Sequence, residues 1–329
     1  MKKVVTKGFY VSCGIILFLC AWLPVSAQYS GTNLETGRLY TAITKDASNN
    51  LYVMRVEAGT GGATYQIVKY TNATGTPVSI FNGLTHQIGD YPWGLAVAAN
   101  GDIYVTKDFT TNGGTVMKLT NNAGSYTASG LVVGKYYSAL ALDANSNLYT
   151  AEYDATNKTY AVVKYLAGST TGTKLYDNLK SAPGYTYPTG LAVAPNGDVY
   201  VADAFSNVPT ITDGGHIYKL TAASSYAVST VSTGNYATAL TVDATGNLFS
   251  SENRGTGYNL VKYTNGTGAG VPVFTSLHTN GIYYPWGISV FNAGEIFVVD
   301  GDDGVHGGAV IKLTPTPPTV VTDAITSPT

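Results

Sequence analysis

Cysteine is nearly absent from this chain. Only Cys13 and Cys20 occur among 329 residues, and both lie within the first 27. Disulfides and thiol chemistry are therefore excluded for everything after residue 27. Charge is scarce as well, at 12% of residues, and the only long apolar run covers residues 11–23.

The first 27 residues have the features of a secretory signal peptide. Three lysines precede the apolar run, and residues 25–27 offer small side chains at a cleavage point. A retained membrane anchor is the alternative, although the run is short for a spanning helix. Leu19 before Cys20 departs from the lipoprotein pattern. We expect a bacterial protein exported to the cell surface or the medium, with no membrane insertion after cleavage.

The balance of charges argues against nucleic acid as a partner. Three of the 18 basic residues and none of the 20 acidic residues lie in the first 27, so the remainder carries a formal charge of −5. Phosphate binding needs clustered lysine and arginine. The partners that we expect are a carbohydrate or an extracellular protein, bound by a monomer.

What the chain has in abundance is glycine and tyrosine, with 38 and 26 residues. This composition is typical of turns and strands rather than helices. One stretch, residues 187–203, has two short apolar runs around a Pro-Asn-Gly turn, which is a strong hairpin signal. It recurs with an aromatic anchor every 45 to 52 residues, at Tyr52, Tyr104, Tyr149, Tyr200, Phe249 and Phe297. Such a period predicts a radial repeat.

Each of the six copies contains an inner strand A, an anchor-bearing strand B and a strand C with a lysine between apolar neighbours. The lysines are Lys69, Lys118, Lys164, Lys219, Lys262 and Lys312. The second, fourth and sixth copies begin with Tyr-Pro-x-Gly. The first, third and fifth have Ala42, Ala139 and Ala239 in place of that glycine and carry an aspartate after strand A. The simplest interpretation of this alternation is that a pair of copies was the unit of duplication.

Only five candidates for an outer strand D follow the six C strands. We expect residues 28–35 to supply the sixth, because pairing the two chain ends would close the ring and remove exposed edges. Residues 319–321 are the alternative donor. The expected domains are a signal peptide (1–27), the repeat domain (28–314) and a Pro/Thr/Ser-rich linker tail (315–329), which could lead into a further domain.

The pattern of residues 188–203, Pro-x-Gly-Leu-Ala-Val followed by Asn-Gly-Asp-Val-Tyr-Val-Ala-Asp, resembles the NHL repeat, and the resemblance covers roughly residues 39–314. It implies an all-β, six-bladed β-propeller with about four strands per blade. It also implies that the ends of the B strands and the starts of the A strands face the channel mouth where ligands bind. Propellers of this kind include enzymes and binding modules, so the fold alone does not fix the function.

Charged residues stand three positions after each anchor and should ring that mouth. They are Arg55, Lys107, Glu152, Asp203, Glu252 and Asp300. One interpretation is a polarised mouth that orients a ligand. The other is that the acids cap the B–C loops by accepting backbone hydrogen bonds.

Aromatic residues gather in sequence near the same mouth. They are Trp93, Trp286, Tyr91, Tyr137, Tyr187 and Tyr284. Exposed on one face, they would make a stacking platform for sugar rings or peptide side chains. The alternative is that they plug the channel or pack between blades.

Evidence for a cofactor is weak. The four histidines, His86, His216, His278 and His306, fall in segments expected at the same face, but none lies in a spaced zinc motif. Asp300, Asp302 and Asp303 depart from the calcium-loop spacing. Six-bladed gluconolactonases hold a cation with Asn or Asp at positions that correspond here to Thr41, Trp93, Ser138, Thr189, Thr238 and Trp286, which argues against lactonase chemistry. We expect no bound cofactor, with calcium or zinc as the minor alternative.

The sequence thus favours a secreted, non-catalytic binding module that recognises a carbohydrate or an extracellular protein through one face of the propeller. A metal-dependent lyase or hydrolase of the NHL-propeller type is the first alternative. A structural spacer of a larger surface protein is the second.

Overall fold

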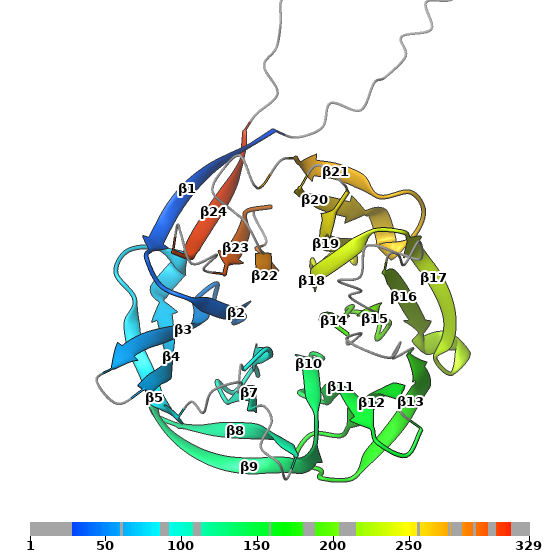
Figure 1. Ribbon diagram of the computed structural model, residues 1–329, viewed down its shortest axis with the longest axis horizontal. Helices are drawn as coiled ribbons and strands as arrows, with labels where there is room; N and C mark the ends of the chain where they lie inside the picture. The colour runs from blue at the N-terminus through cyan, green and yellow to red at the C-terminus, as the bar shows by residue number, and fades with distance from the viewer. Residues whose placement is uncertain are drawn as a thin grey trace, which may run out of the picture.

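The computed structural model describes residues 28–59, 62–85, 92–107, 113–157, 159–179, 188–203, 215–254, 257–275, 277, 285–291, 294–301 and 307–316. These residues form six four-stranded antiparallel sheets, arranged as blades around a central axis (Figure 1). The all-β, six-bladed propeller expected from the repeats is confirmed.

In every blade the four strands run from the channel outward. The inner strands A of blades 1 to 6 are β2 (Tyr40–Lys45), β6 (Leu95–Val97), β10 (Tyr137–Leu142), β14 (Gly190–Val193), β18 (Tyr236–Val242) and β22 (Pro285–Val290). The B strands are β3 (Leu51–Gly59), β7 (Ile103–Lys107), β11 (Leu148–Asp154), β15 (Val199–Asp203), β19 (Leu248–Asn253) and β23 (Ile296–Asp300).

The outer half of each blade completes the sheet. The C strands are β4 (Gly62–Tyr70), β8 (Gly114–Asn122), β12 (Thr159–Tyr165), β16 (His216–Thr221), β20 (Tyr258–Tyr263) and β24 (Ala309–Thr316). The D strands are β5 (Val78–Thr85), β9 (Ser125–Lys135), β13 (Gly172–Leu179), β17 (Ala227–Thr233), β21 (Val271–Phe274) and, in blade 6, β1 (Gln28–Thr36). Three C–D turns contain single 3₁₀ turns, η1 (Thr71–Ala73), η2 (Ala222–Ser224) and η3 (Thr264–Gly266). Across the described residues, no helix has the length and apolarity needed to cross a bilayer.

The ring is closed by the N-terminal strand, as expected. Strand β1 pairs antiparallel with β24, from Gln28 opposite Thr316 to Thr36 opposite Ala309, and the two lie side by side in Figure 1. Strand β24 continues through Pro315 to Thr316, two residues into the segment expected as linker. The alternative donor, residues 319–321, lies outside the described residues.

The six lysines in register pack on the six aromatic anchors. Each lysine lies directly across from its anchor in the B–C ladder, for example Lys164 opposite Tyr149 and Lys262 opposite Phe249. The six ammonium nitrogens lie 5.1 to 6.0 Å from the ring centroids. A cation over an aromatic face gains electrostatic energy, while its alkyl stem covers the ring. This pair explains why both residues recur in every copy.

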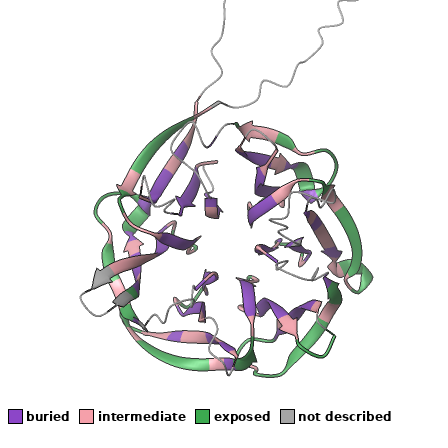
Figure 2. Cartoon of the chain, viewed as in Figure 1, coloured by how far each residue is buried: buried purple, intermediate pink, exposed green. Residues whose placement is uncertain are grey.

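The core lies between the blades. The inner strands are largely buried, whereas the outer D strands carry the exposed surface (Figure 2). Six apolar clusters each join neighbouring blades; one of them brings Tyr40 and Val68 of blade 1 against Phe297 and Val310 of blade 6. Because every face packs on the next blade, no blade is complete without its neighbours.

The alternation of glycine and alanine at the start of strand A has a packing cause. A Cβ atom on Gly94 would lie 2.7 Å from Leu140 Cγ, and one on Gly287 would lie 2.8 Å from Ile43 Cγ2. The even-numbered blades therefore approach the following blade more closely than a methyl group allows. Ala42, Ala139 and Ala239 occupy the corresponding positions of the odd-numbered blades.

Candidate functional site

The inner strands surround a channel along the propeller axis. Each inner strand is the last strand of its sheet on that side, so one of its edges faces the channel. The cavity within it has a volume of about 290 Å³. Backbone groups of this edge that have no partner within the protein can donate or accept hydrogen bonds, whereas the Ala237 carbonyl already accepts from Thr189 Oγ1 (2.6 Å).

Side chains along the wall fall into levels, because the inner strands share one register against their B strands. The register position nearest the mouth holds Thr41, Trp93, Ser138, Thr189, Thr238 and Trp286, of which Trp93, Thr189 and Trp286 line the cavity and Thr41, Ser138 and Thr238 are buried. Next come Ala and Gly, then a level of Leu and Ile, and then the small residues that face the anchors. The last register position holds Lys45, Val97, Leu142, Val193 and Val242, which line the cavity, and Val290, which is buried in the apolar cluster between blades 5 and 6.

The two tryptophans meet at the mouth. Trp93 precedes β6 of blade 2, and Trp286 lies in β22 of blade 6; their rings are stacked with centroids 4.3 Å apart and an interplanar angle of 10°. Both line the channel and both are partly exposed. Since blade 1 separates their two blades, the indoles meet in front of the inner strand of blade 1. The structure thus brings into contact two residues 193 positions apart, for which the repeat register predicted only a shared mouth.

The polar neighbour of this pair is Thr106. Its Oγ1 accepts hydrogen bonds from the backbone N–H of Trp93 (3.2 Å) and of Gly94 (2.8 Å). The edge of the Trp286 ring lies against Gly301, where a Cβ atom would be 2.0 Å from Nε1. Thr106 thus fixes the backbone at Trp93, and the Trp286 ring packs against Gly301.

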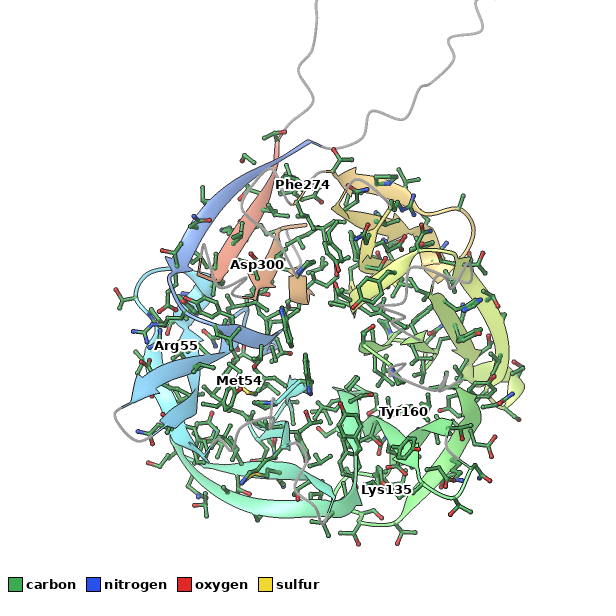
Figure 3. All side chains as sticks on the ribbon, viewed as in Figure 1. Met54, Arg55, Lys135, Tyr160, Phe274 and Asp300 are labelled. Atoms are coloured by element: carbon green, nitrogen blue, oxygen red, sulfur yellow. The ribbon has the colours of Figure 1, made fainter. Side chains whose placement is uncertain are left out.

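The charged residues after the anchors mostly serve contacts inside the protein. In blade 1, Arg55 forms ion pairs with Glu35 of β1 and with Glu57 (3.0 Å), and it donates to Gln66 Oε1 (2.8 Å). Tyr70 donates its hydroxyl to Glu35 (2.6 Å). Figure 3 shows Arg55 within blade 1, away from the channel. This network ties the closing strand to blade 1.

Glu152 in blade 3 is buried and plays a similar part. It accepts hydrogen bonds from Lys135 of blade 2 and from the Tyr165 hydroxyl (2.8 Å). Lys135 lies at the periphery where blades 2 and 3 meet (Figure 3). Burial, and then the bond to Glu152, raise the pKa of Tyr165. At the junction of blades 6 and 1, Arg55 lies on strand B of blade 1 and Glu35 on the outer strand of blade 6. At the junction of blades 2 and 3 the charges are exchanged, with Glu152 on strand B of blade 3 and Lys135 on the outer strand of blade 2.

Glu252 in blade 5 is buried too. It accepts hydrogen bonds from Ser250, from the Tyr263 hydroxyl (2.6 Å) and from Arg254 (2.9 Å). Burial, and then this acceptor, raise the pKa of Tyr263 to about 12. Side chains, rather than the expected loop amides, are the donors to both glutamates.

The remaining members of the predicted ring stand at the ends of their B strands. Asp300 ends β23 and is fully buried, Lys107 ends β7 and is partly exposed, and Asp203 ends β15. Tyr137 is buried, and its pKa is raised by burial and by the charge of Glu152. Tyr91, Tyr187 and Tyr284 lie outside the described residues.

Of the four histidines, only His216 belongs to the described residues. It begins β16, and its ring stacks on Tyr218 with centroids 5.4 Å apart. His86, His278 and His306, together with Asp302 and Asp303, lie outside that part of the chain. Among the described residues, no three His, Cys, Asp or Glu side chains converge as metal ligands would.

Sequence reasoning missed Lys45, which is the one charged side chain among the described residues that line the channel. Its ammonium lies 5.0 Å from the centre of the Phe291 ring. Burial lowers the pKa of Lys45, against the charge of Asp243, which raises it. The available signal was that five copies of the repeat have Val or Leu where the first has lysine.

A second pocket lies at the opposite end of the propeller, between blades 4 and 5. It has a volume of about 460 Å³ and is lined by the A–B turns of both blades together with Tyr200, Lys219, Asn265 and Thr267. Lys219 is held there by Asp198, 2.9 Å away. Because the lysine is already neutralised, the pocket has little net charge to offer.

Comparison with known proteins agrees with this architecture. The sequence profile of the NHL repeat matches residues 185–207, the copy in blade 4. A comparison with curated protein sequences finds no match.

Solved structures of similar fold have diverse functions. An α-L-arabinanase of Penicillium chrysogenum, solved with arabinobiose, is 12% identical with a TM-score of 0.60, over 87% of this chain and 98% of that chain. The calcium-binding protein regucalcin of Agrobacterium tumefaciens is 14% identical with a TM-score of 0.54, over 88% and 96%. A chain of a nidogen/laminin complex is 13% identical with a TM-score of 0.51, over 69% and 76%. At these identities the similarity shows the fold alone.

Proposed function

Starting from a six-bladed β-propeller that carries an NHL repeat, we propose that this chain is an exported, non-catalytic module that binds carbohydrate at the channel mouth. The observation that carries the proposal is the stacked pair Trp93–Trp286 above a channel with free strand edges. Indole faces stack on the apolar faces of sugar rings, and backbone amides and carbonyls hydrogen-bond to hydroxyl groups.

In this proposal the charged residues that follow the anchors contribute little to ligand binding. Arg55, Glu152 and Glu252 are engaged inside the protein and offer little surface to a ligand. Neutral contacts by the indoles and the strand edges then carry the affinity. A sugar ligand is compatible with the propeller fold, because the arabinanase of similar fold was solved in complex with arabinobiose.

The tryptophans are also the means of the test. The chain has three tryptophans, and Trp22 lies in the predicted signal peptide, so the exported form contains only Trp93 and Trp286. Intrinsic tryptophan fluorescence and the indole bands of the near-ultraviolet circular dichroism then report on the mouth alone. A panel of soluble neutral oligosaccharides and polysaccharides would be titrated while both signals are recorded.

We expect at least one glycan to change the fluorescence. The single variants Trp93→Ala and Trp286→Ala should each weaken that binding about tenfold, because a lost stacking partner costs on the order of 1 kcal/mol. Trp93→Phe, which keeps an aromatic face, should retain most of it. Affinity unchanged by both alanine variants would remove the basis of the proposal. A response to a protein ligand but to no glycan would favour the extracellular protein instead.

A further inference from the structure

Lys45 is an exception in an otherwise apolar level of the channel. The five equivalent residues are Val97, Leu142, Val193, Val242 and Val290. A partly desolvated ammonium costs free energy that a valine would not. A charge at this position therefore needs compensation, to which contacts within the protein contribute.

Two groups of the protein act on the Lys45 ammonium. The Phe291 ring offers its face, and Asp243 acts through its charge. The Asp243 carboxylate is itself committed to its own turn, accepting from Thr245 N (2.9 Å), Thr245 Oγ1 (2.8 Å), Asn247 N (2.9 Å) and Asn247 Nδ2 (2.8 Å). An ammonium has three donors, so Lys45 can serve a ligand in the channel in addition to its contacts within the protein.

Lys45 and the tryptophan pair mark the two ends of one cavity. Four residues of strand separate the level of Thr41 and Trp93 from the level of Lys45, which corresponds to about 13 Å along the axis. The wall between them is apolar or hydroxylated and contains no carboxylate among its described residues. With a volume of about 290 Å³, the cavity has room for the end of a chain rather than for a large ligand.

We propose that the channel binds the end of an acidic glycan, with a uronic acid carboxylate at the Lys45 ammonium and a sugar ring against the Trp93–Trp286 pair. This inference rests on the proposed carbohydrate function and names its ligand class. The free strand edges bind the hydroxyl groups between these two ends. Specificity for acidic over neutral glycans then depends on one residue of the chain.

The test uses the exported chain and matched sugars that differ only in charge. Short oligosaccharides of galacturonate, glucuronate and mannuronate are titrated beside the same oligosaccharides after reduction of their carboxyl groups to alcohols. The variants are Lys45→Met, Lys45→Arg and, as a control, Lys69→Met, which removes another lysine of the same blade that lies over Tyr52. Thermal unfolding establishes that each variant is folded.

We expect one acidic oligosaccharide to bind at least tenfold more tightly than its reduced form. Lys45→Met should abolish that preference, Lys45→Arg should keep most of it, and Lys69→Met should leave it unchanged. Raising the salt concentration should weaken binding of the acidic sugar but not of the reduced one, which tests the wild-type chain even if Lys45→Met unfolds.

Equal affinities for the acidic and reduced sugars, or a preference that survives in Lys45→Met, would overturn the inference. If the reduced sugars still bind and Trp93→Ala weakens them, the carbohydrate function stands without its acidic specificity. If no sugar of either set binds, the acidic assignment is wrong, and titration with the neutral glycans decides separately on the function.

Discussion

The odd-numbered and even-numbered blades share the same pair of a lysine and an aromatic anchor. They differ in the position of the acidic residue near that pair. In blades 2, 4 and 6 the residue two positions before the anchor is Asp102, Asp198 or Glu295, and it forms an ion pair with the lysine of strand C at 2.8, 2.9 and 2.6 Å. In blades 1, 3 and 5 the same position holds Asn50, Asn147 or Asn247. No carboxylate of the described residues forms an ion pair with Lys69, Lys164 or Lys262.

Both kinds of blade still satisfy the same backbone donor. Asp198 accepts from Ala222 N in the C–D turn (2.9 Å), and Asn247 accepts from Asn265 N (3.0 Å). The amide of Asn247 also donates to Asp243, which organises the A–B turn. In the odd-numbered blades the carboxylate therefore belongs to the A–B turn, whereas in the even-numbered blades it pairs with the lysine of strand C. Asn and Asp are interchangeable as acceptors of this N–H, but only a carboxylate neutralises a lysine.

Among the variants predicted here, a substitution at the junction of blades 4 and 5 should lower the free energy of unfolding most. A Cβ atom on Gly266 would lie 1.9 Å from the Tyr200 hydroxyl, and Gly266 has φ +60°. At the corresponding junction, Phe297 of blade 6 and Ala73 of blade 1 share one cluster, so a methyl group replaces the hydroxyl. Gly266→Ala should lower the free energy of unfolding by about 2–3 kcal/mol, measured by urea denaturation.

The matched background decides the cause of that loss. In Tyr200→Phe, which imitates blade 6, Gly266→Ala should cost less than about 1 kcal/mol, the remaining cost being that of a left-handed alanine. An equal loss in both backgrounds would mean that the backbone, rather than the hydroxyl, demands glycine.

Exchanging aspartate and asparagine two positions before the anchor should have the next largest effect on the free energy of unfolding. Asp198→Asn keeps the acceptor for Ala222 N but leaves the partly buried Lys219 without its carboxylate, at a cost of about 1–2 kcal/mol. Asn247→Asp sets a second carboxylate beside Asp243 and should cost a similar amount. Adding Asp243→Asn to the latter should restore most of the stability. Failure of that rescue in equilibrium unfolding would show that the turn needs Asp243 itself.

Acid should affect the even-numbered blades through these carboxylates. Burial opposes ionisation of Asp198, but the bonds from Lys219, Ala222 N and Asn196 outweigh it and lower the pKa of Asp198. A carboxyl group whose pKa is lower when folded stabilises the protein above its unfolded pKa, and this contribution is lost as the pH falls through the folded value. Between about pH 5 and pH 2, the stability difference between wild type and Asp198→Asn should therefore shrink. A constant difference would mean that the ion pair is not the source.

Replacing the lysine of strand C should lower the stability least when the lysine belongs to an odd-numbered blade. Lys262→Met deletes only a cation–π contact over Phe249, at about 0.5–1 kcal/mol. Lys219→Met also leaves Asp198 buried without its ammonium and should cost more. Thermal unfolding of both variants tests the comparison directly, and equal shifts would count against a separate role for the even-blade acids.

Much of the architecture could be predicted from local sequence. Alternating apolar residues around turn motifs define the hairpins, and six aromatic anchors in register define the blades, because a strand buries alternate side chains whatever its distant neighbours are. For the missing sixth outer strand, residues 28–35 were favoured over residues 319–321, and the structure pairs β1 with β24. The family resemblance was confirmed in the copy at residues 185–207.

The site was less predictable. The register alone put Trp93 and Trp286 at one mouth, but not in contact with each other. The ring of charges was expected at the mouth, yet Glu152 and Glu252 turn into the junctions between blades and meet the tyrosines Tyr165 and Tyr263 there. Side-chain direction at a strand end depends on the partner available across the junction, and that partner comes from another strand or blade.

The sequence by itself therefore determined the number of blades and their strands, and it favoured residues 28–35 as the closing strand, since these depend on spacing along the chain. Only the tertiary structure decided that two indoles stack in front of blade 1 and that Lys45 is the charge in the channel wall. Both depend on the distance between strands of different blades, which the packing of the whole ring sets and no single repeat contains.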